Sequence, residues 1–65
     1  MASPVDRMLE TLIREEEALN HRYRQLAEQA ETPAVTTAMK KYATQGYERI
    51  QQLYRLWKSV QETKP

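Results

Sequence analysis

Apolar residues recur along this chain at spacings that alternate between three and four. In the first half, the residues at this spacing are Val5, Leu9, Leu12, Glu16, Leu19, Tyr23, Leu26 and Ala30. In the second half they are Val35, Met39, Tyr42, Gly46, Arg49, Leu53, Leu56 and Val60. A sustained alternation of this kind is typical of helices that pair in a left-handed coiled coil. The pattern therefore predicts two amphipathic helices, each with one inward stripe.

Signals for helix starts and stops divide the chain between the two stripes. Ser3-Pro4-Val5-Asp6 combines a capping residue, a proline suited to the first helical position and an acid that completes a capping box. Glu31-Thr32-Pro33 ends the first helix, because proline disfavours helical geometry in the residue before it. We therefore expect an all-α fold, an antiparallel two-helix hairpin over about 4–30 and 33–62, in a single domain 1–65.

Folding the chain back at Thr32-Pro33 matches the two stripes layer by layer, with paired positions that sum to 65. Glu16 and Arg49, the one charge on each stripe, then fall in the same layer with opposite signs. We interpret them as an internal ion pair, bidentate where geometry allows, that sets the register of the helices. Removing one member of a buried pair costs about 3–5 kcal/mol, so Glu16→Ala should weaken folding, whereas replacing both residues by leucine should not. Gly46, opposite Leu19, would let the helices approach closely.

The second helix carries a further apolar stripe beside the first: Ala43, Tyr47, Ile50, Tyr54 and Trp57. One partner helix cannot cover two adjacent faces, and contiguous exposed apolar patches mark interaction sites. Aromatic residues are frequent anchors of such interfaces. The sequence therefore predicts a homodimer, a four-helix bundle whose interface is formed by Tyr47, Ile50, Tyr54 and Trp57. In a weaker alternative, the same stripe docks onto a different protein or a membrane surface.

Composition limits the other functions that the chain can have. Sixty-five residues make one marginal domain, and the absence of cysteine excludes disulfides, thiolate zinc sites and thiol nucleophiles, so a partner chain is the expected source of further stability. Ten basic against nine acidic residues argue against nucleic-acid binding. No apolar run approaches the roughly 20 residues of a membrane span. Met1-Ala2-Ser3-Pro4 lacks the features of a signal peptide, so we expect a cytoplasmic protein.

Two stretches resemble the first helix of a rubrerythrin-type, ferritin-like helical hairpin: Leu12-Ile13-Arg14-Glu15-Glu16-Glu17-Ala18 and Tyr23-Arg24-Gln25-Leu26-Ala27-Glu28-Gln29-Ala30. In that family a glutamate is followed seven residues later by a tyrosine and then by a Leu-Ala-Glu-x-Ala run. The second helix of the family carries Leu-Ala-x-x-Glu-x-x-His, which supplies two further ligands of a di-iron site. The resemblance implies a ferritin-like bundle in which Glu16 stands at a ligand position.

The matching stretch of the second helix is Tyr42-Ala43-Thr44-Gln45-Gly46-Tyr47-Glu48-Arg49, which puts Gly46 and Arg49 at the two ligand positions. Glycine has no ligand atom, and guanidinium is a fixed cation that cannot coordinate metal. We therefore expect a non-catalytic interaction or assembly protein without metal or cofactor. The alternative is a carboxylate iron-binding or oxidase protein assembled from two chains, each giving Glu16 and Glu48.

Overall fold

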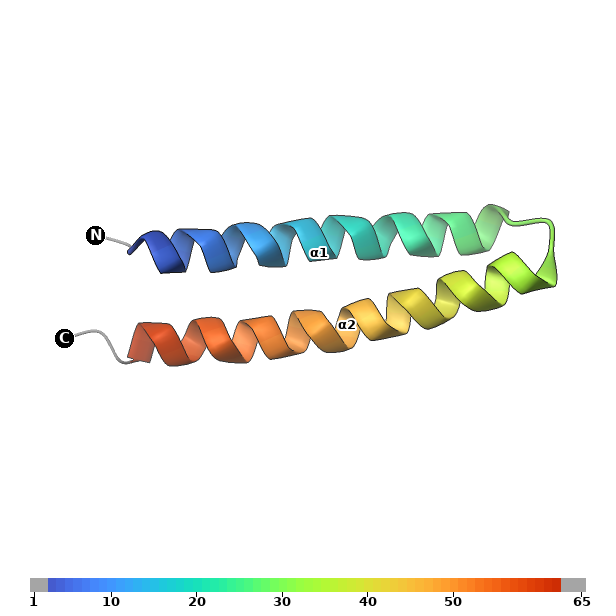
Figure 1. The fold of residues 1–65 in the computed structure, drawn as a ribbon. Helices are drawn as coiled ribbons and strands as arrows, with labels where there is room; N and C mark the ends of the chain where they lie inside the picture. Colours follow the sequence, from blue (N-terminus) through green and yellow to red (C-terminus); the bar gives the residue numbers. More distant parts are fainter. Residues whose placement is uncertain (1–2, 63–65) are drawn as a thin grey trace.

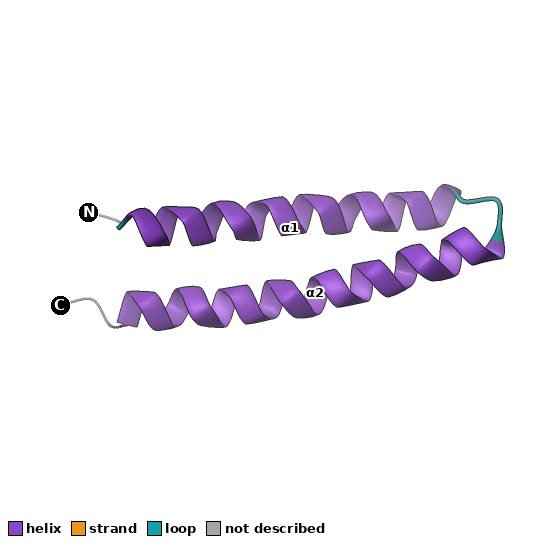
Figure 2. Ribbon diagram, in the orientation of Figure 1, coloured by secondary structure: helices purple, strands orange, loops and turns teal. Residues whose placement is uncertain are grey.

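The computed structural model describes residues 3–62, which form two helices, α1 (Pro4–Gln29) and α2 (Pro33–Glu62). The expected all-helical class is confirmed, and the two helices pack against each other (Figure 2). No strand occurs within the described range. Residues 30–32 link the helices, and the helix ends fall within one residue of those expected from the sequence.

The helix starts follow from the caps that the sequence predicts. The Asp6 N–H donates to Oγ of Ser3 over 3.2 Å, and the Ser3 N–H donates to Oδ2 of Asp6 over 3.4 Å, which completes a capping box. At the start of α2, the Val35 N–H donates to Oγ1 of Thr32 over 3.4 Å. These bonds satisfy N–H groups that have no partner inside the helix. The capping box and the prolines therefore explain where each helix begins.

The chain doubles back after α1, so that the first turns of α1 lie beside the last turns of α2 (Figure 1). The resulting hairpin measures 52 × 15 × 10 Å and has a radius of gyration of 15.1 Å. A compact domain of this length would have a radius of gyration of about 11 Å. The protein is therefore a thin rod, two helices wide, with more surface for its length than a globule has.

The faces along which the helices meet differ in part from the predicted stripes. Half of each stripe lies in the contact, namely Leu9, Glu16 and Tyr23 on α1 with Ala30 at its C-cap, and Met39, Gly46, Leu53 and Val60 on α2. The other half of the contact is made by the residue that follows each remaining stripe member: Asp6, Ile13, Asn20 and Ala27 on α1 and Thr36, Ala43, Ile50 and Trp57 on α2. All sixteen residues, which we call the seam, are buried or half-buried. Each helix is thus turned by about 50° from the predicted orientation.

The prediction that the whole of each stripe points inward was therefore wrong. Both orientations satisfy the same alternation of three and four, so the spacing cannot distinguish them. Two features of the seam favour the observed one. Ala27, Ala43 and Gly46 let the two backbones approach closely, and the Nδ2 amide of Asn20 donates to the backbone carbonyl of Ala43 over 2.5 Å. Leaving this buried amide without a hydrogen-bond partner would lower the free energy of unfolding by about 1–3 kcal/mol.

The core of the hairpin is small. Its buried apolar residues are Leu9, Ile13, Ala27, Ala43 and Ile50. Within residues 3–62, no large side chain falls below 2% exposure. The accessible surface of the chain is 5353 Å², whereas a compact monomer of 7.7 kDa would expose about 4,300 Å². A single hairpin therefore leaves roughly 1,000 Å² more surface in water than a compact protein of its mass.

Candidate functional site

One side of the hairpin carries a row of exposed apolar side chains, which we call the aliphatic face. Its members are Val5, Leu12, Leu19 and Leu26 from α1 and Val35, Tyr42 and Leu56 from α2. Residues seven apart lie on one stripe of a helix, so each helix contributes a single row. Between 39% and 53% of each of these residues is exposed. This is the half of the predicted stripes that the hairpin leaves uncovered.

Two contacts across the helices show that both rows border the same edge of the seam. Tyr42 lies against Tyr23, with ring centroids 5.9 Å apart. Two turns further along α2, Nε of Arg49 donates to Oε1 of Glu16 over 3.0 Å. Tyr23 and Glu16 each stand three or four residues from members of the α1 row, such as Leu19. The α2 row therefore lies beside the α1 row and forms one continuous surface with it.

The Glu16–Arg49 pair lies at the margin of the seam rather than in its interior. The Glu16 side chain is 23% exposed and the Arg49 side chain is 50% exposed. A single hydrogen bond joins the two side chains, where a bidentate pair was expected. Arg49 occupies the aliphatic face between Tyr42 and Leu56 in the α2 row, so the pair neutralises the one charge in that row.

This position sets the expected effect of breaking the pair. Glu16→Ala should lower the free energy of unfolding by less than about 1 kcal/mol, because half-exposed ion pairs are weak, rather than by the larger amount expected of a buried pair. Urea denaturation at low and high salt measures the effect, and the loss should shrink at high salt. Glu15→Ala is the matched control, since Glu15 is an exposed neighbour. A loss above about 3 kcal/mol would show that the pair behaves as a buried one.

The four residues predicted from the sequence to form the interface lie in different environments. Ile50 is 7% exposed and Trp57 is half-buried, both within the seam of one hairpin. Tyr47 and Tyr54 are exposed, by 53% and 40%. Tyr47 and Tyr54 each directly follow a seam residue of α2, whereas members of the aliphatic face such as Tyr42 directly precede one. Because successive residues are turned by about 100° around a helix, the two sets lie on opposite flanks of the seam. The structure therefore brings Tyr47 and Tyr54 to one surface and places Ile50 and Trp57 beneath it.

Tyr54 contacts residues of both helices. Its hydroxyl donates to Oε1 of Glu17 over 3.3 Å, and its ring lies 6.3 Å from that of Trp57. Partial removal from water, together with the charge and hydrogen bond of Glu17, raises the pKa of Tyr54 above its ordinary value. The phenol is therefore protonated at neutral pH and acts as a hydrogen-bond donor.

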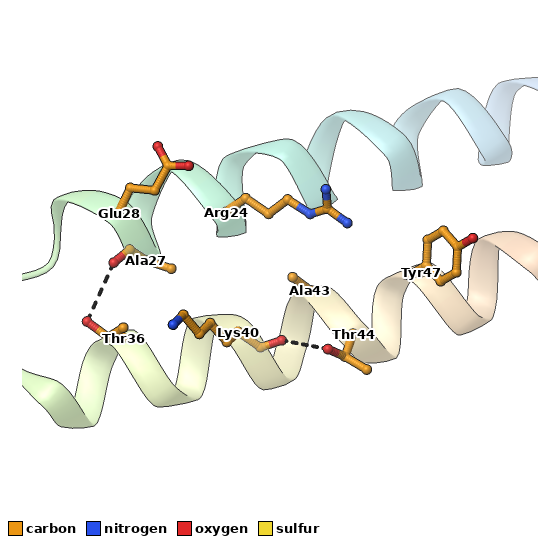
Figure 3. Close-up of a pocket in the computed structure, with 8 residues that line it drawn as sticks. All are labelled: Arg24, Ala27, Glu28, Thr36, Lys40, Ala43, Thr44 and Tyr47. Atoms are coloured by element: carbon orange, nitrogen blue, oxygen red, sulfur yellow. Dashed lines mark hydrogen bonds between the residues drawn. The ribbon is translucent and has the colours of Figure 1, made fainter.

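The side with Tyr47 and Tyr54 is hollowed along its length. Near the link between the helices, a hollow of about 630 Å³ is lined by Arg24, Ala27, Glu28, Thr36, Lys40, Ala43, Thr44 and Tyr47 (Figure 3). Its floor is formed by the small residues Ala27 and Ala43, while longer charged side chains stand around it. The Thr36 hydroxyl, at one end, donates to the carbonyl of Ala27 over 3.5 Å. Two smaller hollows, of about 300 and 340 Å³, continue along the same side towards Gln61.

Asn20 is a buried polar residue of the seam that the sequence pattern alone did not single out. It is 7% exposed and makes the buried hydrogen bond to Ala43 described above. A Cβ built on Gly46 would lie 3.0 Å from Nδ2 of Asn20, so the glycine leaves room for this amide. The available signal was the seven-residue spacing of Ile13, Asn20 and Ala27, which places a polar residue on an apolar row.

The positions singled out by the ferritin-like resemblance are occupied by other interactions. Gly46 adjoins Asn20, and Arg49 bonds Glu16. Within residues 3–62, no three histidine or acidic side chains are grouped closely enough to hold a metal ion. Neither described helix is long and apolar enough to cross a bilayer. Comparisons with protein-family models, with curated proteins and with solved structures find no match to this chain.

Proposed function

We propose that this protein is a non-catalytic assembly module in which two antiparallel hairpins pair through their aliphatic faces into a four-helix bundle. The observation that carries the proposal is the aliphatic face itself: seven large apolar side chains, each at least 39% exposed, on one side of the rod. Soluble monomers rarely expose a contiguous apolar surface of this extent. In this arrangement the face becomes the second half of a core that one hairpin cannot complete.

The amount of uncovered surface supports a second copy as the partner. The chain exposes 5353 Å², roughly 1,000 Å² more than a compact monomer of its mass. A stable protein–protein interface buries about 800 Å² on each partner. One further hairpin, two helices wide and of equal length, offers a matching area. An isologous contact also places the same apolar rows on both sides of the interface.

The charges of the two helices support a particular orientation of the pair. Helix α1 contains four basic and six acidic residues, a net charge of −2, whereas α2 contains five basic and two acidic residues, a net charge of +3. Complementary charge on facing surfaces favours one docking orientation over others. We propose that α1 of each copy lies against α2 of the other. The Glu16 carboxylate neutralises Arg49 within the covered face and so lowers the cost of burying it.

Sedimentation equilibrium at micromolar concentration tests this proposal. The wild-type chain should show twice the monomer mass of 7.7 kDa. Leu12→Glu/Leu19→Glu should reduce the mass to that of a monomer, because four carboxylates would meet at the apolar interface. Thr11→Glu/Ala18→Glu is the matched control: it adds the same charge at exposed neighbouring positions and should leave the dimer intact. A wild-type chain that remains a folded monomer at this concentration would contradict the proposal.

A further inference from the structure

We propose that the hollowed side of the hairpin is a second docking surface and that it binds one acidic amphipathic helix of another protein. The three hollows form one groove, which we call the trough. The first and second share Arg24 and Tyr47, and the second and third share Gln51 and Tyr54. The trough therefore runs from the groove between α1 and α2 onto the adjoining surface of α2, whose residues alone line the third hollow.

The trough lies on the side away from the aliphatic face, so self-association leaves it open. Its walls come from residues on the opposite flank of the seam, such as Glu17 and Arg24 on α1 and Tyr47 and Tyr54 on α2. The hydrogen bond from Tyr54 to Glu17 crosses between the helices on this flank, whereas the Glu16–Arg49 pair crosses on the other. Each copy in a dimer would thus present its own trough to the solvent.

The charge of the trough points to an acidic partner. Four cations line it, Arg24, Lys40, Arg55 and Lys58, against two carboxylates, Glu17 and Glu28. Within residues 3–62, none of the four cations takes part in an ion pair. Glu17 already accepts the Tyr54 hydroxyl. An approaching carboxylate therefore meets cations that are not engaged, which favours it over a basic partner.

The shape of the trough favours a helix as the occupant. The first two hollows lie between α1 and α2, and the third is lined by α2 alone. A groove between two packed helices accommodates the side-chain ridge of a third helix. Both flanking helices have their backbone groups engaged, so an extended peptide could not add to them as a strand. Its floor contains the apolar residues Ala27, Ala43 and Ile50, while Tyr47 and Tyr54 offer aromatic anchors. From Thr36 to Tyr54, the two hollows between the helices extend for about 27 Å along α2, which matches a helix of about 18 residues.

Fluorescence anisotropy with two designed helical peptides tests this inference. The acidic peptide, of about 18 residues, has leucines three and four residues apart and glutamate or alanine elsewhere, and the basic peptide has lysine in place of glutamate. The acidic peptide should bind the wild-type chain at least about tenfold more tightly than the basic one. Arg24→Glu/Lys40→Glu should weaken its binding by at least about tenfold.

The matched control is Arg22→Glu/Lys41→Glu, which makes the same change in charge at neighbouring residues that do not line the trough. It should weaken binding of the acidic peptide by less than about threefold, through the long-range field alone. Equal binding of both peptides, or equal losses in the two variants, would overturn the inference. So would binding to anionic phospholipid vesicles or single-stranded nucleic acid without binding to the acidic peptide.

The same measurement separates this inference from the proposed self-association. The Leu12→Glu/Leu19→Glu variant changes only the aliphatic face, so its affinity for the acidic peptide should stay within about threefold of the wild type. A wild-type chain that is monomeric yet binds the peptide through Arg24 and Lys40 would overturn self-association and support the trough. Loss of binding in the aliphatic-face variant, with its helix content unchanged, would contradict the assignment of the site to the trough.

Discussion

Ile13→Ala is expected to lower the free energy of unfolding by about 2–5 kcal/mol, because it deletes buried methyl groups and leaves a cavity in the seam. Ile13 is 3% exposed, the lowest value among the buried apolar residues. A domain of this size has a free energy of unfolding of about 3–10 kcal/mol, so the substitution removes a large part of it. Urea denaturation followed by circular dichroism measures the loss, with an osmolyte added if the variant is partly unfolded.

Leu12→Ala is the control for Ile13→Ala, because the two neighbouring residues have opposite environments. Leu12 is 46% exposed in the hairpin and lies on the aliphatic face. Its truncation should act through self-association, so the loss in stability should depend on protein concentration. The loss in Ile13→Ala should remain at concentrations where the chain is monomeric. If Leu12→Ala were the more damaging variant at such concentrations, the predicted stripe rather than the observed seam would form the core.

Gly46→Leu is expected to destabilise the hairpin by about 1–3 kcal/mol. A Cβ at this position would lie 3.0 Å from Nδ2 of Asn20, and the rest of a leucine side chain would need space that α1 occupies. Overpacking of this kind costs about 1–3 kcal/mol, and displacing the Asn20 amide removes a hydrogen bond worth about 1 kcal/mol. Leucine has a higher helix propensity than glycine, which offsets about 1 kcal/mol of this loss. Thermal unfolding followed by circular dichroism should show the loss.

Two further variants isolate the contact between Gly46 and Asn20. Gln45→Leu introduces the same side chain at an exposed neighbour and should leave the stability nearly unchanged. In an Asn20→Ala background, Gly46→Ala should be stabilising by about 1 kcal/mol, because the space is then free and only helix propensity remains. In the presence of Asn20 this gain should be reduced or reversed. Equal effects of Gly46→Ala in both backgrounds would mean that the two residues are not coupled.

The candidate surfaces were only partly predictable from the sequence. The pairing of Glu16 with Arg49 follows from two opposite charges at matching positions, and the structure joins these side chains at 3.0 Å. Their exposure does not follow from the sequence, because it depends on how far each helix is turned. The trough also depends on that rotation. Arg24 and Lys40 are far apart in the sequence, and only the packed hairpin brings them to the rim of one hollow.

The sequence by itself determines the two helices, their ends and the hairpin that they form. Its signals are local: the capping box of Ser3 and Asp6, the proline at residue 33 and long runs of helix-forming residues act within a few residues of one another. Local signals of this kind can be recognised without knowing what the helix packs against.

The tertiary structure decides which side of each helix faces inward. Two adjacent stripes on each helix share the same alternation of three and four, so hydrophobic spacing supports either one. The choice depends on how side chains from distant parts of the chain fit together. Ala43 and Gly46 of α2 are small enough to leave room for the Asn20 side chain of α1, whose amide donates to the Ala43 carbonyl. That fit turns Leu12, Leu19 and Leu26 to the surface, where a second copy can cover them.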